Sequence, residues 1–478
     1  LGVELLHRIS REEPRDRLTQ FTEDFVARYE DREVPLVHVL DEEAGIGFAD
    51  IAASHADASP LLAGLGFPGR SEEPKVMWGK RQDFLAQKLQ DALRAGMQQI
   101  VLGPDDLKQL EGTDPPPLPD SFSIVATVLA AKQADLAQGN FQIHLHGISG
   151  PSGANLLGRF CHGDEVLARY AEQHVHAEEQ LRPGAVFAEV VHLPEGRIGN
   201  VVLRPFLRGY EIPYLGCSCA PDDRQIPITD LLVSIKDGRI VLRSARLGCE
   251  VIPRLTTAHN FSSPRNLGIY RFLCALQGQG ISIGLSLGWG PLAQAPFLPR
   301  VVLGKLILSP ARWILSTTQL KSLGEARGVA AQFLAVQKLR AELRLPRWVA
   351  VVDGDNRLPL DLDNILSIGT GLQLLKEREQ ATLTELLTDP EQLCAWGPEG
   401  AFVHEIIVPV LRVKEAEHES PPAQRRPSAA QLVADQPRSF APGSEWLYAK
   451  LYTGPATADQ VLREVVRPVV DGALTSGA

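Results

Sequence analysis

RIGNVVLRPFLRGYEIPYLGCSCAPDDRQIPITDLLVSIKDGRIVLRSARLGCEVIPRLTTAHNFSSPRNLGIYR, residues 197–271, is the stretch on which the interpretation of this chain depends. It holds eleven Lys or Arg and six Asp or Glu, a formal charge of +5, whereas all 478 residues together carry −10. The remainder therefore carries −15. A basic segment in an acidic protein is where an anionic partner is expected to bind. Charge alone leaves an alternative, in which a strand-rich segment carries solvated arginines.

The same stretch predicts antiparallel β structure. Residues 231–235 and 240–243 flank an Asp237-Gly238 pair, and Asp-Gly favours the left-handed turn of a hairpin. Elsewhere, apolar runs predict more strands, a helix at 329–343 and a second helix that starts near Ser262. We expect an α+β fold of several subdomains, with mixed helices and antiparallel or mixed sheets. The other expected strands are 123–129, 141–146, 185–193 and 200–204, and residues 31–48 are expected to be extended.

Composition restricts the class of protein. An apolar share of 44% and a charged share of 22% are ordinary for a globular chain of two or three domains. No apolar run approaches the ~20 residues of a membrane span, and no signal-peptide pattern is present. Six cysteines in so long a chain favour a reducing compartment. We expect a cytoplasmic protein, with a peripheral position at the inner face of the membrane as the alternative. Because the chain begins with Leu1, we expect the native start to lie upstream.

Several short motifs have residue types that occur in nucleotide-binding loops or metal sites. Residues 147–153 form a glycine-rich loop without the Lys-Ser/Thr pair of a nucleotide loop, although its amides could still face an anion. The pairs His144-x-His146 and His174-x-His176 lack the further ligands of a metal site, as does Cys217-x-Cys219, so we predict no metal.

The other two motifs concern single polar residues. His259 and Asn260 lie among Thr and Ser residues without a nucleophile elbow, which favours a hydrogen-bonded turn. Arg159, a single charge among apolar residues, needs either an anionic ligand or an internal ion pair.

Longer runs of residues carry a resemblance to the class I lantibiotic dehydratase family. The runs within the basic stretch are 200–205, 210–213, 225–227, 242–244, 250–264 and 270–274; those outside it are 31–36, 45–48, 155–160, 347–352, 354–357 and 446–452. Together they cover nearly the whole chain, which resembles a middle part of a full-length family member.

The resemblance implies an activity and its partners. Such enzymes glutamylate Ser and Thr of a ribosomally made precursor peptide with glutamyl-tRNA, then eliminate glutamate to leave a dehydroamino acid. It implies the precursor peptide, glutamyl-tRNA and a lanthionine cyclase as partners, allows a homodimer, and requires no cofactor besides that co-substrate. By their places in the matching runs, Arg159 and Arg204 are implied as catalytic residues that contact the tRNA end or the developing oxyanion. Substrate and tRNA contacts are implied for Asn155, Arg208, His259, Asn260 and Arg271.

The expected domain organisation follows the same resemblance. Residues 1–120 are expected to form a helical and mixed segment of the glutamylation domain, and 121–413 its β-rich α+β core. Residues 414–444 are polar and rich in Pro, Gln, Ser and Ala, which predicts a linker. Residues 445–478 are expected to begin an elimination domain, so the chain is interpreted as a partial enzyme. Two alternatives stay open: a peptide–aminoacyl-tRNA ligase, and a non-catalytic scaffold that binds the precursor peptide and the cyclase.

Overall fold

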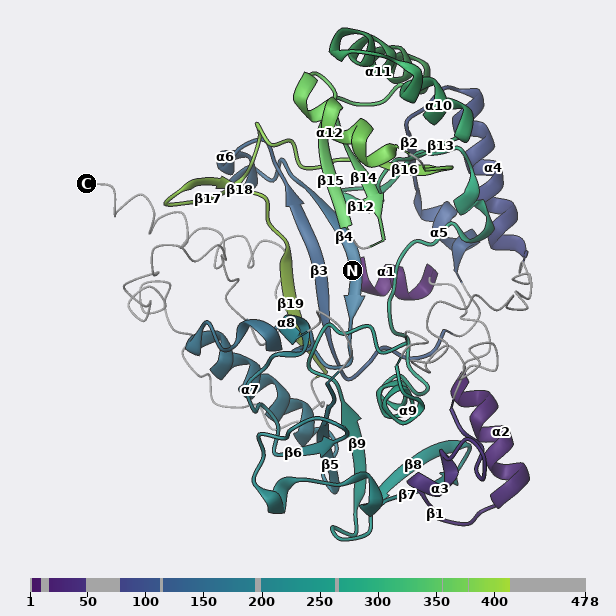
Figure 1. The fold of residues 1–478 in the computed structure, drawn as a ribbon, viewed down its shortest axis with the longest axis vertical. Coiled ribbons are helices and arrows are strands. Elements are labelled where there is room, and N and C mark those ends of the chain that lie inside the picture. Colours follow the sequence, from purple (N-terminus) through teal and green to yellow (C-terminus); the bar gives the residue numbers. More distant parts are fainter. Residues whose placement is uncertain are drawn as a thin grey trace.

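The computed structural model describes residues 2–9, 17–48, 78–111, 115–193, 199–262, 266–354, 356–376 and 378–412. The predicted linker at 414–444 and the predicted start of an elimination domain at 445–478 lie outside these residues. The described residues form four sheets, two of six strands, one of five and one of two. Figure 1 shows them as a lower sheet, a central sheet that runs vertically, and an upper sheet. The predicted α+β class with mixed sheets is confirmed.

The lower sheet contains most of the basic stretch. Its strands lie in the order β1 (Val34–Pro35), β7 (Leu231–Lys236), β8 (Arg239–Ser244), β9 (Glu250–Arg254), β5 (Ala185–Val191) and β6 (Tyr210–Pro213). The predicted hairpin is confirmed, because Asp237 and Gly238 between β7 and β8 have φ angles of 49° and 72°. Strand β5 pairs in parallel with both β6 and β9.

Aromatic and aliphatic side chains fill the core of the lower sheet. The helices α2 (Arg17–Tyr29), α3 (Leu36–Val39) and α9 (Gly268–Leu276) supply much of it. Phe21 of α2 lies 4.7 Å from Phe272 of α9, measured between ring centroids. Burial of such rings stabilises the fold by about 1.5–3 kcal/mol for each side chain, so the three helices are held against this sheet.

The central sheet joins the lower and upper parts of the molecule (Figure 1). Its strand order is β19 (Ile406–Leu411), β3 (Ser121–Leu129), β4 (Gln142–Ser149), β12 (Leu306–Ser309), β11 (Arg300–Leu303) and β2 (Gln99–Val101). Residues from α1 (Gly2–Ile9), α4 (Lys80–Arg94) and α5 (Pro104–Leu110) share a core with Leu145 and Ile148 of β4. The β3–β4 register shifts between Val125 and Ala126, and this irregularity lets Leu145 and Ile148 both face the core although they are three residues apart. Because side chains otherwise alternate along a strand, His144 lies on the face opposite to Leu145.

The upper sheet has the order β10 (Phe297–Leu298), β13 (Arg312–Leu315), β16 (Ala381–Glu385), β14 (Trp348–Asp353) and β15 (Asn356–Asp361). Helices α10 (Thr317–Glu325), α11 (Val329–Leu343) and α12 (Ile365–Leu375) pack on it around Trp313 and Val349. The predicted helix at 329–343 is thereby confirmed. The smallest sheet is a hairpin of β17 (Ala395–Gly397) and β18 (Gly400–Phe402), and α6 (Gln133–Ala137) lies close to it in Figure 1.

Three local predictions were wrong. Residues 200–204 were expected to be a strand, but α8 (Gly199–Val202) occupies that position. The extended stretch at 31–48 contains only the short β1 before α3 begins. The helix expected to start near Ser262 begins at Gly268, with Leu267 as its N-cap and no side-chain cap. Helices α3 and α9 pack against β7 and β9 of the lower sheet, and α8 packs against the 3-10 helix η2 (Gly158–Phe160). Local sequence does not specify such long-range contacts.

Candidate functional site

The polar face of the central sheet is where titratable side chains gather. Thr127 of β3 is the cross-strand partner of His144 on β4, so both point to the same face. His146 lies two residues further along β4, and its Nε2 is 2.8 Å from the hydroxyl oxygen of Thr127. The rings of His144 and His146 lie 4.1 Å apart between centroids. In the register that pairs Ile406 with Ala126, Glu405 comes beside Thr127.

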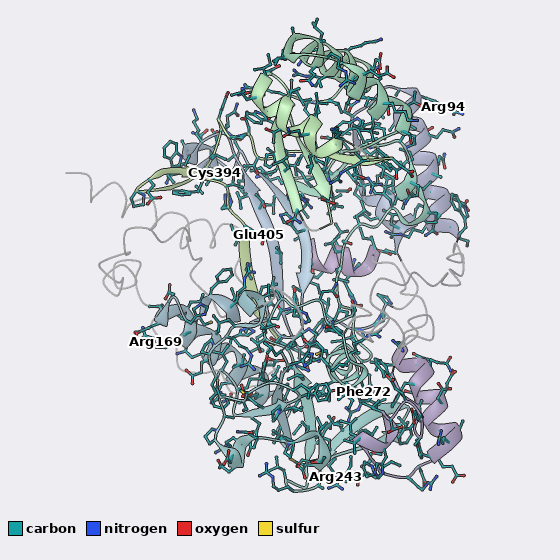
Figure 2. All side chains as sticks on the ribbon, viewed as in Figure 1. Arg94, Arg169, Arg243, Phe272, Cys394 and Glu405 are labelled. Carbon is teal, nitrogen blue, oxygen red and sulfur yellow. The ribbon has the colours of Figure 1, made fainter. Side chains whose placement is uncertain are left out.

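Two arginines from other elements flank this face. Arg159 lies on the short 3-10 helix η2 (Gly158–Phe160), whose surrounding turn packs against β19 through Ile407. Arg357 lies on β15 of the upper sheet. We call Thr127, His144, His146, Arg159, Arg357 and Glu405 the sheet-face cluster. Figure 2 shows Glu405 at mid-height, between the upper and lower parts of the molecule.

The cluster holds its histidines neutral. Burial lowers the pKa of His144 to about 3, and the charges of His146 and Arg357 act in the same direction. Burial and Arg357 also lower the pKa of His146. For Glu405 the surrounding protein raises the pKa by desolvation, against the opposing charges of Arg357 and Arg159. Near neutral pH the two histidines are therefore uncharged, and the positive charge of the cluster comes from Arg159 and Arg357.

Neither arginine of the cluster has a carboxylate partner within the described part of the chain. Arg159 lies over the ring of Phe160, with its guanidinium carbon 4.5 Å from the ring centroid, and no ion pair or hydrogen bond of its side chain with another described residue occurs. Arg357 is exposed and equally unpaired among described residues. An unpaired guanidinium beside a polar face offers planar donors for a carboxylate or a phosphate.

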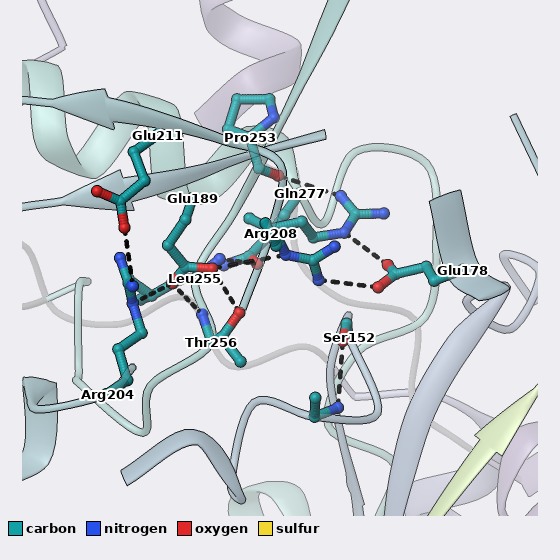
Figure 3. A network of polar contacts seen from close by, with 12 residues as sticks. Ser152, Glu178, Glu189, Arg204, Arg208, Glu211, Pro253, Leu255, Thr256 and Gln277 are labelled. Atoms are coloured by element: carbon teal, nitrogen blue, oxygen red, sulfur yellow. Dashed lines mark hydrogen bonds and ion pairs between the residues drawn. The ribbon is translucent and has the colours of Figure 1, made fainter. Parts of the chain in front are cut away.

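The arginines of the basic stretch are arranged differently. Arg204, 9% exposed, lies 3.0 Å from Glu189 and 3.0 Å from Glu211. Arg208, fully buried, contacts Glu178 at 2.9 Å and Glu189 at 3.5 Å. Figure 3 shows Arg204 and Arg208 among Glu178, Glu189 and Glu211. Together with Arg254 and Glu179, which pair with Glu178 and Arg208, these residues form what we call the buried arginine–glutamate network. Arg204 and Arg208 therefore do not form a surface for an anionic partner, because glutamates neutralise their charges inside the protein.

Glu178 illustrates how strongly this network is coupled. Burial alone would raise the pKa of its carboxyl, but the positive charges of Arg208 and Arg254 outweigh that effect and lower it to about 2. Arg254 donates from Nε to Glu178 at 2.8 Å. A buried ion pair is sustained only when such geometry offsets desolvation, so the network is an organised structural element.

The network reaches the sheet-face cluster through Thr256. Glu189 accepts hydrogen bonds from both the backbone N–H and the hydroxyl of Thr256. Gly158, the residue before Arg159, lies directly against the carbonyl oxygen of Thr256. Two of the implied residues, Arg159 and Arg204, are thus connected by Glu189 and Thr256, without sharing one charged surface.

The other residues implied by the resemblance fall into two places. Asn155 lies in the turn before η2, where its amide donates to the Ser149 hydroxyl at 2.9 Å, and its buried carbonyl oxygen has no hydrogen-bond partner among the described residues. His259 belongs to a separate group, 2.8 Å from the Tyr270 hydroxyl. Asn260 accepts from Ser262 in an exposed turn, as expected for the hydrogen-bonded alternative, and Arg271 is buried on α9.

No group of three or more His, Cys, Asp and Glu side chains suited to a metal ion occurs in the described ranges. His174, of the second histidine pair, lies buried with its Nε2 2.9 Å from the Ser121 hydroxyl. Within the same ranges no helix has the length and apolarity to cross a membrane.

Three members of the cluster, Thr127, Arg357 and Glu405, were not singled out as candidate site residues in the sequence. Arg357 lies in the run 354–357, which carried part of the resemblance, so that run was a usable signal. Glu405 has no such signal, because it precedes an ordinary apolar strand, β19. Only the pairing of β19 with β3 brings it to the polar face.

Comparison with known proteins gives a consistent result. The family described as "Lantibiotic dehydratase, N terminus" matches residues 2–369. Subtilin biosynthesis protein SpaB of Bacillus subtilis is 22% identical over 463 residues, which cover 94% of this chain and 42% of SpaB. Nisin biosynthesis protein NisB of Lactococcus lactis subsp. lactis is 23% identical over 159 residues, or 33% of this chain and 14% of NisB.

Solved structures are similar over most of the chain. The tRNA-dependent lantibiotic dehydratase MibB from Microbispora sp. 107891 has a TM-score of 0.69 and 26% identity, covering 85% of this chain and 38% of MibB. The glutamylation domain of TbtB from thiomuracin biosynthesis shares the fold, with a TM-score of 0.51 and 21% identity, over 82% of this chain and 47% of that one. The chain thus spans less than half the length of these relatives. On the match across residues 2–369, it belongs to the lantibiotic dehydratase N-terminal family.

Proposed function

We propose that this chain forms the glutamylation part of a lantibiotic dehydratase. In this proposal it transfers the glutamyl group of glutamyl-tRNA to Ser and Thr hydroxyls of a precursor peptide, which prepares them for elimination. Similarity to MibB, named as tRNA-dependent, and the fold shared with the TbtB glutamylation domain support it. Hydroxide is a poor leaving group and a carboxylate is a better one, which is the chemical reason for the glutamyl ester.

The observation that carries the proposal is the pair of unpartnered arginines in the sheet-face cluster. Glutamyl-tRNA presents phosphates next to a reactive ester, and the ester oxygen gains negative charge as a hydroxyl attacks. Arg159 and Arg357, which flank one polar face, supply donors for such an anion. We assign Arg159 to contact with the tRNA end or the oxyanion, and Asn155 to the same face. Because Arg204 and Arg208 are enclosed by glutamates, we assign both to positioning of the turn that carries Arg159.

Within the same proposal, residues 1–413 provide the glutamylation region, 414–444 a linker and 445–478 the beginning of an elimination domain. Substrate contacts at His259, Asn260 and Arg271 belong to it as well, at the α9 end of the lower sheet. A lanthionine cyclase would act on the dehydrated product.

The test compares Arg159→Ala and Arg357→Ala with Arg169→Ala, an exposed arginine of α7 (Glu165–Gln180) outside the cluster. Each variant is titrated with glutamyl-tRNA and then incubated with precursor peptide for mass spectrometry. Loss of one donor to a developing oxyanion typically costs about 3 kcal/mol, so glutamylation should fall ~100-fold in the first two variants and stay unchanged in the third.

The products separate the alternatives. An ester on Ser or Thr supports the proposal, whereas an amide at the peptide terminus would indicate a peptide–aminoacyl-tRNA ligase. Peptide binding without any product would indicate a scaffold. Wild-type glutamylation by Arg159→Ala and Arg357→Ala would contradict the proposed role of the cluster.

A further inference from the structure

We propose that Glu405 is the proton acceptor for the attacking Ser or Thr hydroxyl, an assignment that rests on the function proposed above. Glu405 is the residue directly before β19, and continuing the β19–β3 register by one residue brings it beside Thr127, whose partner on β4 is His144. Cross-strand partners point to the same side of a sheet. The carboxylate therefore faces the same space as the two arginines.

Glu405 differs from the other carboxylates near the site because its oxygens are free to accept a proton. Glu405 keeps access to solvent although the surrounding protein partly desolvates its carboxyl, and it makes no hydrogen bond or ion pair with another described residue. By contrast, Glu189 and Glu211 are each 1% exposed and hold Arg204. A proton acceptor must present a free oxygen to the hydroxyl, within hydrogen-bond reach, and Glu405 meets this requirement.

The groups that face Glu405 come from every neighbouring element. Arg159 approaches from η2 and Arg357 from β15, and both oppose the rise in its pKa that desolvation causes. His144 and His146 belong to the same face on β4, and His404 precedes Glu405 in the segment that leads into β19; burial lowers the pKa of each histidine. A carboxyl with a raised pKa is a better base than an ordinary one.

The neighbouring histidines are weaker candidates for the same role. His144 has a pKa of about 3, so its ring has little affinity for a proton at neutral pH. The Nε2 of His146 is engaged with the Thr127 hydroxyl at 2.8 Å. His404 has its Nε2 directed to the backbone N–H of Val128. Glu405 is thus the available base beside the arginines.

The reaction balances without another reactant. The peptide hydroxyl oxygen forms a bond to the ester carbonyl carbon, and its proton passes to the Glu405 carboxylate. The resulting oxyanion faces Arg159 and Arg357. When the carbonyl re-forms, the bond to the tRNA ribose oxygen breaks, and that oxygen takes the proton back from Glu405. The products are a glutamyl ester on the peptide and free tRNA.

The experiment uses the full chain as wild type, Glu405→Gln, Glu405→Asp and the control Glu399→Gln, an exposed carboxylate in the turn between β17 and β18. Two quantities are measured: the Kd for glutamyl-tRNA and the single-turnover rate of transfer to the peptide. Loss of a general base lowers a rate by about 10²–10⁴-fold. Glu405→Gln should show that loss with a Kd that is unchanged or lower, because removing a negative charge beside two arginines favours an anion. Glu405→Asp should keep part of the rate, and Glu399→Gln all of it.

The pH dependence gives a second readout. The wild-type rate should fall toward acid as Glu405 takes a proton, and this limb should vanish in Glu405→Gln. If Glu405→Gln transferred the glutamyl group at the wild-type rate, the proposed function would stand, whereas the assignment of Glu405 as proton acceptor would be overturned. A loss of tRNA affinity equal to the loss of rate would overturn it in favour of an ordering role. A wild-type chain that binds glutamyl-tRNA but never modifies the peptide would contradict the proposed function as well.

Discussion

Gly158 and Thr256 are in backbone contact: a Cβ atom on Gly158 would lie 2.3 Å from the carbonyl oxygen of Thr256. This contact joins the turn that carries Arg159 to the segment that Glu189 holds by two hydrogen bonds. The side chain at position 159 is therefore placed by a glycine that permits close approach. A larger residue must displace one of the two backbones.

The first prediction concerns that glycine. Gly158→Ala should lower the free energy of unfolding by about 1–3 kcal/mol, the usual effect of overpacking, and weaken glutamyl-tRNA binding because Arg159 moves. Gly369→Ala is the matched control, since nothing lies within 4 Å of its added Cβ in the interior of α12. Gly369→Ala should raise the free energy of unfolding by about 0.5–1 kcal/mol, because alanine suits a helix interior better than glycine does. Urea unfolding and tRNA titration measure both; equal stability of the two variants would refute the contact argument.

A second prediction tests the buried arginine–glutamate network. Arg208→Met leaves Glu178 and Glu189 without one of their cations, and breaking a buried pair costs about 3–5 kcal/mol. Arg239→Met removes a surface pair with Glu250, in which the arginine side chain is 44% exposed. Such pairs contribute about 0–1 kcal/mol. Denaturant unfolding should therefore rank Arg208→Met far below Arg239→Met; similar values would show that the network contributes little.

Acid sensitivity of the fold provides a third prediction. The pKa of His144 is about 3 in the folded protein against an ordinary 6.5, so the unfolded chain takes the proton first as pH falls. The stability contribution of neutral His144 is present above pH 6.5 and is lost between pH 6.5 and 3. His144→Phe should flatten the dependence of unfolding free energy on pH in this window by up to about 1.4 kcal/mol per pH unit. Above pH 7 the two curves should run parallel; a variant as steep as wild type in acid would exclude His144 as the source.

The cysteines allow a fourth prediction, on accessibility. Cys217 and Cys219 are exposed, whereas Cys161, Cys274 and Cys394 are buried. Burial also raises the pKa of Cys161 to about 12, which keeps it protonated and unreactive. Iodoacetamide should label Cys217 and Cys219 in the native protein, and all six cysteines in denaturant, as read by peptide mass spectrometry. Native labelling of Cys274 at the same rate would contradict the packing around α9.

The sequence predicted the fold best where the conformational preferences of neighbouring residues are sufficient by themselves. The Asp237-Gly238 turn follows from backbone preference, and α11 follows from a run rich in the strong helix formers Ala, Leu, Gln, Lys, Arg and Glu. Residues 200–204 failed for the opposite reason. Their apolar, β-branched pattern suits a strand, but α8 occupies this position and is followed by Arg204 with its two glutamate partners, Glu189 and Glu211.

The candidate site was harder to predict because charge in a sequence says nothing about pairing. The basic stretch contains Arg204, Arg208 and Arg254, yet Glu178 and Glu189, which lie outside that stretch, face them. The unpartnered arginines, by contrast, lie outside it, at 159 and 357. Tertiary structure decided which charges were available.

The pairing of β19 with β3 has a consequence for synthesis of the protein. Residue 126 meets its partner only after residue 406 has left the ribosome, so the edge of β3 stays open while the whole upper sheet is made. An open edge strand invites pairing with other chains. Translation rate and chaperone supply should therefore govern the yield of this protein, and fragments that end before β19 should aggregate on expression.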